Sequence, residues 1–124
     1  MLKHQFRLKK KSSFNATYRI RHSYHRDGIV LWVGKKKNDL QTTTKVGFVV
    51  SKKTHKRAVR RNRLKRLMRE SYRLLLKNGE IDKSQQFLSL IFVGFEKALD
   101  KDFNQINQTI YELLNNIRKE RKEG

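Results

Sequence analysis

Long apolar runs separated by charged segments predict three buried strands in the chain. Such runs occur at residues 29–33, 46–51 and 87–93, and the second is apolar enough to lie centrally in a sheet. Asp27-Gly28 is a turn signal before the first run. The charged segment 35–39 lies between the first two runs, and we interpret it as the connection of a hairpin.

Three helices are predicted from capping residues and from apolar positions that recur every three or four residues. Ser12 or Ser13 can cap a short N-terminal helix, and Asp102 can cap a closing helix. The longest helix covers about residues 57–77 and ends at Asn78-Gly79. The closing helix carries one apolar stripe, formed by Phe103, Ile106, Ile110, Leu113, Leu114 and Ile117.

This order of elements predicts a single α/β (α+β) domain over residues 1–124. A strand, a long helix and a second strand follow one another over 46–93, which predicts a parallel strand pair joined by a crossover helix. The expected architecture is a two-layer sandwich with a mixed central sheet, an N-terminal helix, a long basic crossover helix and a C-terminal helix. Residues 1–11 are basic and almost without core residues, so we expect an arm that orders only on contact with a partner. We also expect a flexible C-terminal tail at 119–124.

The composition adds a strong positive charge to this picture. The 124 residues hold 31 Lys or Arg against 11 Asp or Glu, a formal net charge of +20. Because such a chain repels itself when compact, we expect a polyanion as partner: nucleic acid first, an anionic membrane surface second. Cysteine is absent, which excludes disulfide scaffolds and thiol catalysis. The longest apolar run is too short to span a membrane and the first residues do not resemble a secretory signal, so we expect a cytoplasmic protein.

The charge is concentrated in the long helix and the segment before it. Residues 45–77 hold 13 Lys or Arg and one acid, so 13 − 1 gives +12. One side of the helix is apolar, whereas Asn62, Arg66, Arg69 and Arg73 share the opposite side in a row about 16 Å long. Guanidinium groups suit phosphate because they donate two parallel hydrogen bonds and stay charged. The alternative is a solvated face that only keeps the protein soluble. The candidate phosphate-binding residues are Lys52, Lys53, Arg60, Arg61, Asn62, Arg63, Lys65, Arg66, Arg69 and Arg73.

A second candidate surface combines aromatic rings with cations near the N-terminus. Phe14 and Tyr18 lie one helical turn apart, beside a basic cluster. The cluster is formed by Arg7, Lys9 and Lys10. Rings stack on any base and cations follow the backbone, which suits a single strand of variable sequence. The alternative is that both rings belong to the core of a short amphipathic helix. Trp32 is a further candidate, although a lone tryptophan in a strand is usually a core residue.

No catalytic or metal-ligating cluster is predicted. The carboxylate pairs Glu80/Asp82 and Asp100/Asp102 lie at helix ends or in loops, where capping explains them better than hydrolytic chemistry. The four histidines show no spacing typical of a metal site. We therefore expect no tightly bound cofactor on the protein and no catalysis by the protein alone.

The basic stretch is similar to a known protein family. Residues 50–70 read VSKKTHKRAVRRNRLKRLMRE and resemble the signature of the bacterial ribonuclease P protein subunit: a VSKK segment, then an alanine-led helix with an RNR motif, KR and RE. The segment 7–10 with Phe14 and Tyr18 resembles the same family, as do the late strand and the C-terminal helix. The resemblance covers nearly the whole chain.

The resemblance implies a function in tRNA maturation. The family's protein binds a large catalytic RNA, and the complex removes the 5′ leader from precursor tRNA. The RNA carries the phosphodiester chemistry, with Mg²⁺ as the usual ion. The RNR face would contact the catalytic RNA through Arg61, Asn62, Arg63, Lys65, Arg66 and Arg69. The leader would lie in a cleft between the N-terminal helix and the sheet, lined by Phe14 and Tyr18, with the basic cluster and Trp32 beside it. A left-handed crossover is also implied, against the general right-handed rule.

Two departures from the family pattern are local. Many members have a glycine soon after the two lysines, where this chain has residues 54–57 without glycine, and the second aromatic of the first helix is often Phe rather than Tyr18. The competing interpretation is a small basic ribosomal protein. A membrane-surface protein is a third option, but the arginine helix uses its apolar side in the core. We expect no membrane contact and no obligate protein partner.

Overall fold

The structure, a computed structural model, describes residues 2–123, with the side chains of residues 83 and 118–123 excepted. Its strands are β1 (His22–Arg26), β2 (Ile29–Val33), β3 (Lys45–Val49) and β4 (Ser89–Gly94). Its helices are α1 (Lys11–Arg19), α2 (Ala58–Lys77) and α3 (Phe103–Glu123), with short 3-10 turns η1 (His4–Phe6), η2 (Asp82–Gln86) and η3 (Glu96–Ala98).

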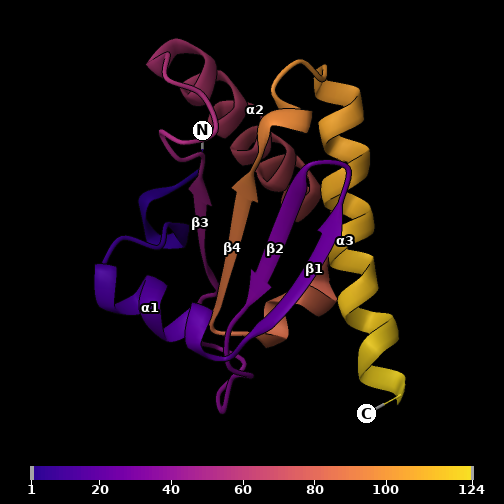
Figure 1. The fold of residues 1–124 in the computed structure, drawn as a ribbon. Helices are drawn as coiled ribbons and strands as arrows, with labels where there is room; N and C mark the ends of the chain where they lie inside the picture. The colour runs from indigo at the N-terminus through magenta and orange to yellow at the C-terminus, as the bar shows by residue number, and fades with distance from the viewer. Residues whose placement is uncertain (1, 124) are drawn as a thin grey trace.

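The four strands form one mixed sheet in the order β1-β2-β4-β3 (Figure 1). β3 and β4 are parallel, whereas the β1–β2 and β2–β4 pairs are antiparallel. In Figure 1, β3 and β4 both run upward, β4 lies to the right of β3, and α2 passes behind the sheet, so the crossover is left-handed. The predicted α+β class, the mixed sheet and the three helices are confirmed.

The two faces of the sheet are covered unequally. α2 and α3 pack against one face, where the ring of Phe48 in β3 stacks on Phe92 in β4 with centroids 5.7 Å apart. The apolar sides predicted for these helices are confirmed, since Leu64, Met68 and Ile110 are fully buried. α1 crosses only one end of the opposite face, where it contacts β2 and β4. Apart from the end under α1, no described helix packs on this second face, which we call the open face.

The strand nearest α3 was missing from the sequence analysis, and one connection was wrong. β1 is a polar edge strand without an apolar run, and it joins β2 through Asp27 (φ 46°) and Gly28 (φ 86°), the left-handed pair that a tight hairpin needs. The segment 35–39 is not a hairpin connection, because β4 lies between β2 and β3. β3, the strand expected to lie centrally, is at the edge of the sheet, whereas β4 lies inside it and is buried almost throughout.

The helix ends agree with the predictions except at α1. Asp102 caps α3, with the amide of Gln105 donating to Asp102 Oδ1 (2.8 Å) and the amide of Asp102 donating to Gln105 Oε1 (3.0 Å). Gly79 (φ 73°) ends α2 as expected. α1, however, begins at Lys11 with Lys10 at the cap position, so neither predicted serine caps it.

The N-terminal segment lies along the free edge of β3. The amide of Leu8 donates to the Val46 carbonyl (2.9 Å), and Arg7 forms an isolated parallel bridge with Val46. Leu2 (3% exposed) and Leu8 are buried, so the described part of the expected arm packs against the sheet. At the other end, the backbone over the expected tail 119–124 continues α3 to Glu123. Residues 1 and 124 lie outside the described part.

Candidate nucleic-acid interface

The solvent side of α2 presents polar and cationic groups without partners. Asn62 and Arg66 are exposed, and Lys65 and Arg69 lie at the rim of the helix. Within residues 2–123, the side chains of Asn62, Lys65 and Arg66 make no hydrogen bond and no ion pair. These groups can therefore bind an external anion without first breaking an internal contact.

The two arginines of the RNR motif are held by backbone carbonyls on opposite sides of α2. Arg61 Nη1 donates to the carbonyls of His55 (2.7 Å) and Lys56 (2.9 Å), in the loop before the helix. Arg63 Nη1 and Nη2 donate to the carbonyls of Leu99 (2.9 Å) and Lys101 (3.2 Å), between β4 and α3. Asn62, the middle residue, points between them to solvent. The motif thus braces two loops as well as offering charge.

Two further predicted cations are paired with acids. Arg60 of α2 forms an ion pair with Asp100, in the segment before α3. Arg73 forms an ion pair with Glu70, one turn earlier on α2 itself. The hydrogen bond from Arg73, with a smaller Coulombic contribution, outweighs desolvation and lowers the pKa of the Glu70 carboxyl. The positive charge of the row predicted along α2 is therefore strongest in the N-terminal and middle parts of the helix, and Glu70 neutralises it near Arg73.

Arg69 joins the row to the N-terminal segment. Its guanidinium lies over the Phe48 ring, 6.0 Å from the centroid. Desolvation by burial, and to a lesser extent the charge of Arg7, lowers the pKa of Arg69. Arg7 pairs with Val46, which belongs to the core under α2, and it donates from Nε to the Leu2 carbonyl (3.1 Å), whereas Leu8 lies on the Phe14 side of Gly47. The structure thus places Arg7 with the α2 surface, rather than beside Phe14 as the sequence suggested.

The lysines before α2 lie in an exposed turn at the end of β3. The turn is closed by the Thr54 amide, which donates to the Ser51 carbonyl (3.0 Å), and the side chains of Lys52 and Lys53 are exposed. Neither lysine has a partner among the residues that the structure describes. Both cations therefore remain available at the carboxyl ends of β3 and β4.

The open face of the sheet carries the three predicted aromatic residues at the end covered by α1. Phe14 lies on Gly47, where a β-carbon would come within 2.6 Å of two of its ring carbons. Tyr18 packs edge-on against Trp32, with ring centroids 5.2 Å apart and planes at 87°. All three rings are half-buried, and burial raises the pKa of the Tyr18 hydroxyl. The rings thus belong partly to the core and partly to an accessible surface.

A buried contact holds α1 in place on this face. The hydroxyls of Thr17 and Ser89 are 2.5 Å apart, and the Thr17 hydroxyl also lies 2.9 Å from the Ser13 carbonyl. Lys9 and Lys10 are exposed directly before α1, and Lys9 contacts the His4 ring. Both lysines thus directly precede the helix that carries Phe14 and Tyr18.

The described carboxylates do not gather into a metal site. Asp100 is paired with Arg60, and Asp102 is used as the α3 cap. Within the described residues no group of three or more His, Cys, Asp or Glu side chains could hold a metal ion. The described donor set therefore does not fit a protein-bound Mg²⁺.

The described helices include none that is long and apolar enough to cross a membrane.

Comparison with known proteins agrees with this arrangement of a basic helix beside an open sheet. A family model described as Ribonuclease P matches residues 2–118. The chain belongs to the ribonuclease P protein family. It is 36% identical over 113 residues to the ribonuclease P protein component of Clostridium novyi, covering 91% of this chain and 94% of the relative.

Solved structures of the family show the same fold. A structure of the Staphylococcus aureus RNase P protein matches with a TM-score of 0.67 and 26% identity, over 89% of this chain and 93% of that one. A second structure of that protein matches with a TM-score of 0.69 and 26% identity, over 93% and 92%. Membership makes this chain a subunit of ribonuclease P, an RNA-processing ribonuclease of tRNA maturation, and the ribosomal alternative is not favoured.

Proposed function

We propose that the chain binds two RNAs through two separate surfaces. The α2 surface, consisting of the ten predicted phosphate-binding residues from Lys52 to Arg73 together with Arg7, binds the catalytic RNA of ribonuclease P. The α1 cleft, consisting of Phe14, Tyr18, Trp32, Lys9 and Lys10, binds the single-stranded 5′ leader of precursor tRNA.

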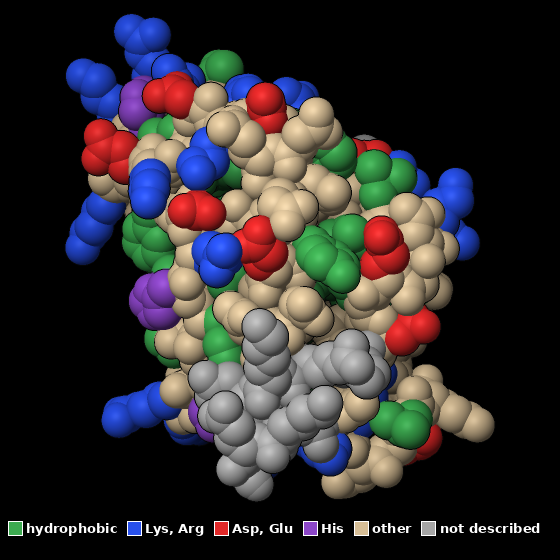
Figure 2. Space-filling model, turned by 90° about the vertical axis from the view of Figure 1, so that its right-hand side faces the viewer, with side chains coloured by type: hydrophobic (Ala, Val, Ile, Leu, Met, Phe, Trp, Pro, Cys, Tyr) green, Lys and Arg blue, Asp and Glu red, His purple; other side chains and the backbone are tan. Residues whose placement is uncertain are grey.

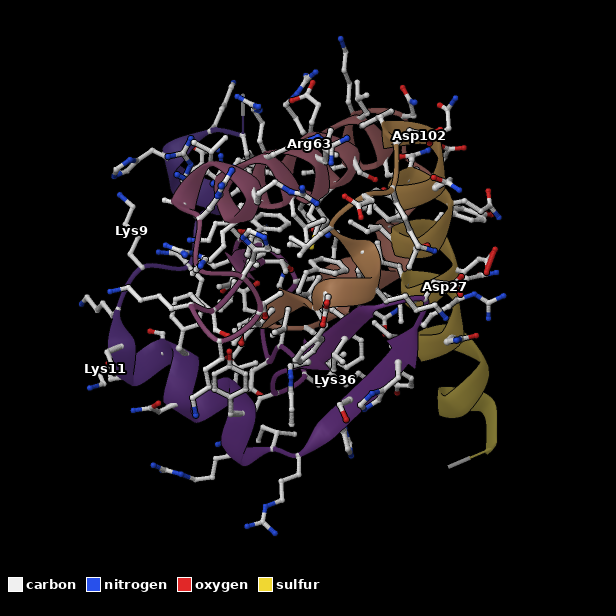
Figure 3. The ribbon with its side chains drawn as sticks, turned by 45° about the horizontal axis from the view of Figure 1, so that its top comes forward. Lys9, Lys11, Asp27, Lys36, Arg63 and Asp102 are labelled. Atoms are coloured by element: carbon white, nitrogen blue, oxygen red, sulfur yellow. The ribbon has the colours of Figure 1, made fainter. Side chains whose placement is uncertain are left out.

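The observation that carries this proposal is the distribution of charge. Residues 1–26 and 40–69 contain no acid, and these segments supply α1, the turn after β3 and most of α2. The acids gather on the α3 side, where Figure 2 shows them among Lys and Arg. In Figure 3, Lys9 and Lys11 lie on one side of the molecule, and Asp27 and Asp102 on the other. RNA therefore approaches from the side away from α3.

Within the α2 surface the residues divide into two roles. Asn62, Lys65 and Arg66 have no internal partner and contact RNA phosphates or base edges directly. Arg61 and Arg63 each donate two hydrogen bonds to loop carbonyls, so they act chiefly by fixing the loops on either side of the helix. Loop placement matters because the loop before α2 carries the exposed lysines.

The α1 cleft suits a leader whose sequence varies. An aromatic face stacks on any base, and neighbouring lysines follow the phosphates without reading the sequence. Mature tRNA has no leader, so binding at this surface distinguishes precursor tRNA from the product.

The phosphodiester chemistry belongs to the RNA with its Mg²⁺ ions, and the protein supplies positive charge. Cations on the protein replace part of the screening that Mg²⁺ gives between RNA phosphates. This role needs no membrane and no further protein partner, and it places the chain in the cytoplasm.

Reconstitution with a bacterial ribonuclease P RNA tests the proposal. Precursor tRNA cleavage is measured across a Mg²⁺ series with RNA alone, protein alone and both together. We expect protein alone to be inactive and the complex to exceed the RNA most at low Mg²⁺. Multiple-turnover cleavage by RNA-free protein, or no gain from adding the protein at any Mg²⁺ concentration, would contradict the proposal.

A further inference from the structure

A depression on the open face of the sheet lies at the end that α1 does not cover. It is lined by His25, Val30 and Phe95 together with the hairpin turn 26–29, and has a volume of about 350 Å³. That size lies within the usual range of small-ligand sites. Phe95 was not singled out in the sequence analysis.

The geometry of the strands places Phe95 on the same face as the α1 cleft. At Gly94 a β-carbon would meet Leu64 of α2, so Gly94 faces α2. Phe95 continues in extended conformation (φ −120°, ψ 174°), and side chains alternate along an extended strand, so its ring points to the opposite face. Val30 pairs with both His25 and Val93, so these three residues lie side by side across β1, β2 and β4.

Phe95 differs from the other phenylalanines of the chain because its side chain is exposed. It is 46% exposed, whereas Phe87 and Phe92 are buried. Its backbone is fixed, since its amide donates to the Gly28 carbonyl (2.8 Å) and its carbonyl accepts from the Ala98 amide (2.9 Å). A rigidly mounted, accessible ring offers a stacking surface with little ordering cost.

The charges next to this ring do not attract phosphate, so a ligand is held at this position through the ring itself. Asp27 lies near Lys97 (3.8 Å) and Arg26 is paired with Glu112, so the charges of the turn are balanced. Glu96, directly after the ring, is exposed and has no ion pair among the described residues, whereas the unpartnered cations Lys52 and Lys53 follow β3, where β3 and β4 end side by side. An exposed ring stacks on a base while cations elsewhere on the protein hold the phosphates, which is how single strands are bound.

We propose that Phe95, with His25 and Val30, forms an additional stacking position for one nucleobase of the leader. Trp32 lies opposite Ile91, and Phe95 follows Ile91 by four positions, about 13 Å along the extended chain. The leader thus runs across the open face from the α1 cleft to Phe95. This inference rests on the proposed function of that cleft.

The test measures binding of the reconstituted holoenzyme to precursor tRNAs with leaders of increasing length. Phe95→Ala should weaken binding between about five-fold and 150-fold for leaders long enough to reach the ring. It should change nothing for a one-nucleotide leader. Phe95→Trp should retain affinity because it keeps a stacking face. Phe95→Leu, which is apolar without a ring, should behave like Phe95→Ala.

The outcomes separate this inference from the function it rests on. If Phe14→Ala causes a leader-dependent loss while Phe95→Ala causes none, the Phe95 position is wrong and the α1 cleft stands. Full affinity of Phe95→Leu, or an equal loss of affinity of Phe95→Ala at every leader length, would also overturn the proposed stacking position at Phe95. If neither variant distinguishes precursor from mature tRNA, the proposed leader site itself fails. Thermal unfolding of each free variant checks that the exposed substitution leaves the fold intact.

Discussion

The Phe14 ring lies directly on the backbone of Gly47, in a space that a single methyl group at residue 47 would occupy. Such a methyl would come within 2.6 Å of ring carbons Cε1 and Cζ, and 3.6 Å from the β-carbon of Leu8. The role of this glycine is therefore to leave space for the ring, and not to make the backbone flexible. It sets the height of Phe14 above the open face, and thus the depth of the α1 cleft.

We predict that Gly47→Ala lifts the Phe14 ring and disturbs leader binding more than folding. The ring carbons nearest the new methyl are at the far end of a side chain that can rotate away, so stability should fall by only about 1–2 kcal/mol. Precursor tRNA should bind more weakly and mature tRNA should be unaffected. In the background of Phe14→Ala the same change should cost little, because the ring is gone.

Gly94→Ala is the matched control for that experiment. Its methyl would meet Leu64 on the opposite face, 2.5 Å from Cδ2. It should lower stability without changing the ratio of precursor to mature tRNA affinity. Additive effects of Gly47→Ala and Phe14→Ala on binding would show that the contact between Gly47 and the Phe14 ring does not control leader binding.

A second prediction separates the two roles within the α2 surface. Arg66→Ala should lower the magnitude of the slope of log K against log salt for the catalytic RNA, by about 0.7–0.9 per lost phosphate contact. Its free energy of unfolding should stay within about 0.5 kcal/mol of the wild type, because the exposed side chain has no internal partner.

Arg63→Ala is expected to behave in the opposite way. It removes the donors to the Leu99 and Lys101 carbonyls and should cost about 1–3 kcal/mol of stability. Its salt slope should change less than that of Arg66→Ala. The measurements are chemical denaturation of the free protein and RNA titrations at several salt concentrations. A large slope change without a stability loss in Arg63→Ala would make it a direct RNA contact.

The sequence predicted best those features that depend on local periodicity. The buried side of α2, with Leu64 and Met68, follows from the helical repeat, and the capping role of Asp102 follows from its position before an apolar stripe. These features need no knowledge of distant residues.

The features that the sequence missed depend on contacts between distant residues. Arg7 lies toward α2 because the N-terminal segment pairs with Val46, and Arg63 is a brace because residues 99–101 return to the helix. β1 carries no apolar run because it lies at a sheet edge. The position of β4 between β2 and β3 is a choice among strand pairings that the apolar pattern leaves open.

A third prediction uses Trp32, the single tryptophan of the chain, as a reporter of leader binding. Its ring is half-buried against Tyr18, so a base entering the α1 cleft should change its emission. A single-stranded RNA should change the fluorescence at concentrations where a duplex of the same sequence does not, because a duplex cannot present unstacked bases. Tyr18→Ala should weaken the response. Equal responses to both RNAs would contradict a single-strand site.

The fourth prediction concerns the stability of the core at alkaline pH. Burial raises the pKa of Tyr72 to about 12, against a smaller lowering by Gln85, whose Nε2 donates to the Tyr72 hydroxyl (2.9 Å). The pKa of a tyrosine in the unfolded chain is about 10. Because the folded pKa is the higher one, the unfolded state loses its proton first as the pH rises. The contribution of Tyr72 is therefore complete below about pH 10 and is lost between about pH 10 and 12.

Tyr72→Phe isolates this effect. At neutral pH the variant should be less stable by about 1 kcal/mol, because it lacks the hydrogen bond from Gln85. Between about pH 10 and 12 the wild type should lose about 2–3 kcal/mol relative to Tyr72→Phe, since each pKa unit is worth about 1.4 kcal/mol. Gln85→Ala should keep the alkaline loss, because it retains the buried hydroxyl. Parallel curves of unfolding free energy against pH for the wild type and Tyr72→Phe would show that this hydroxyl ionises as readily in the folded protein as in the unfolded chain.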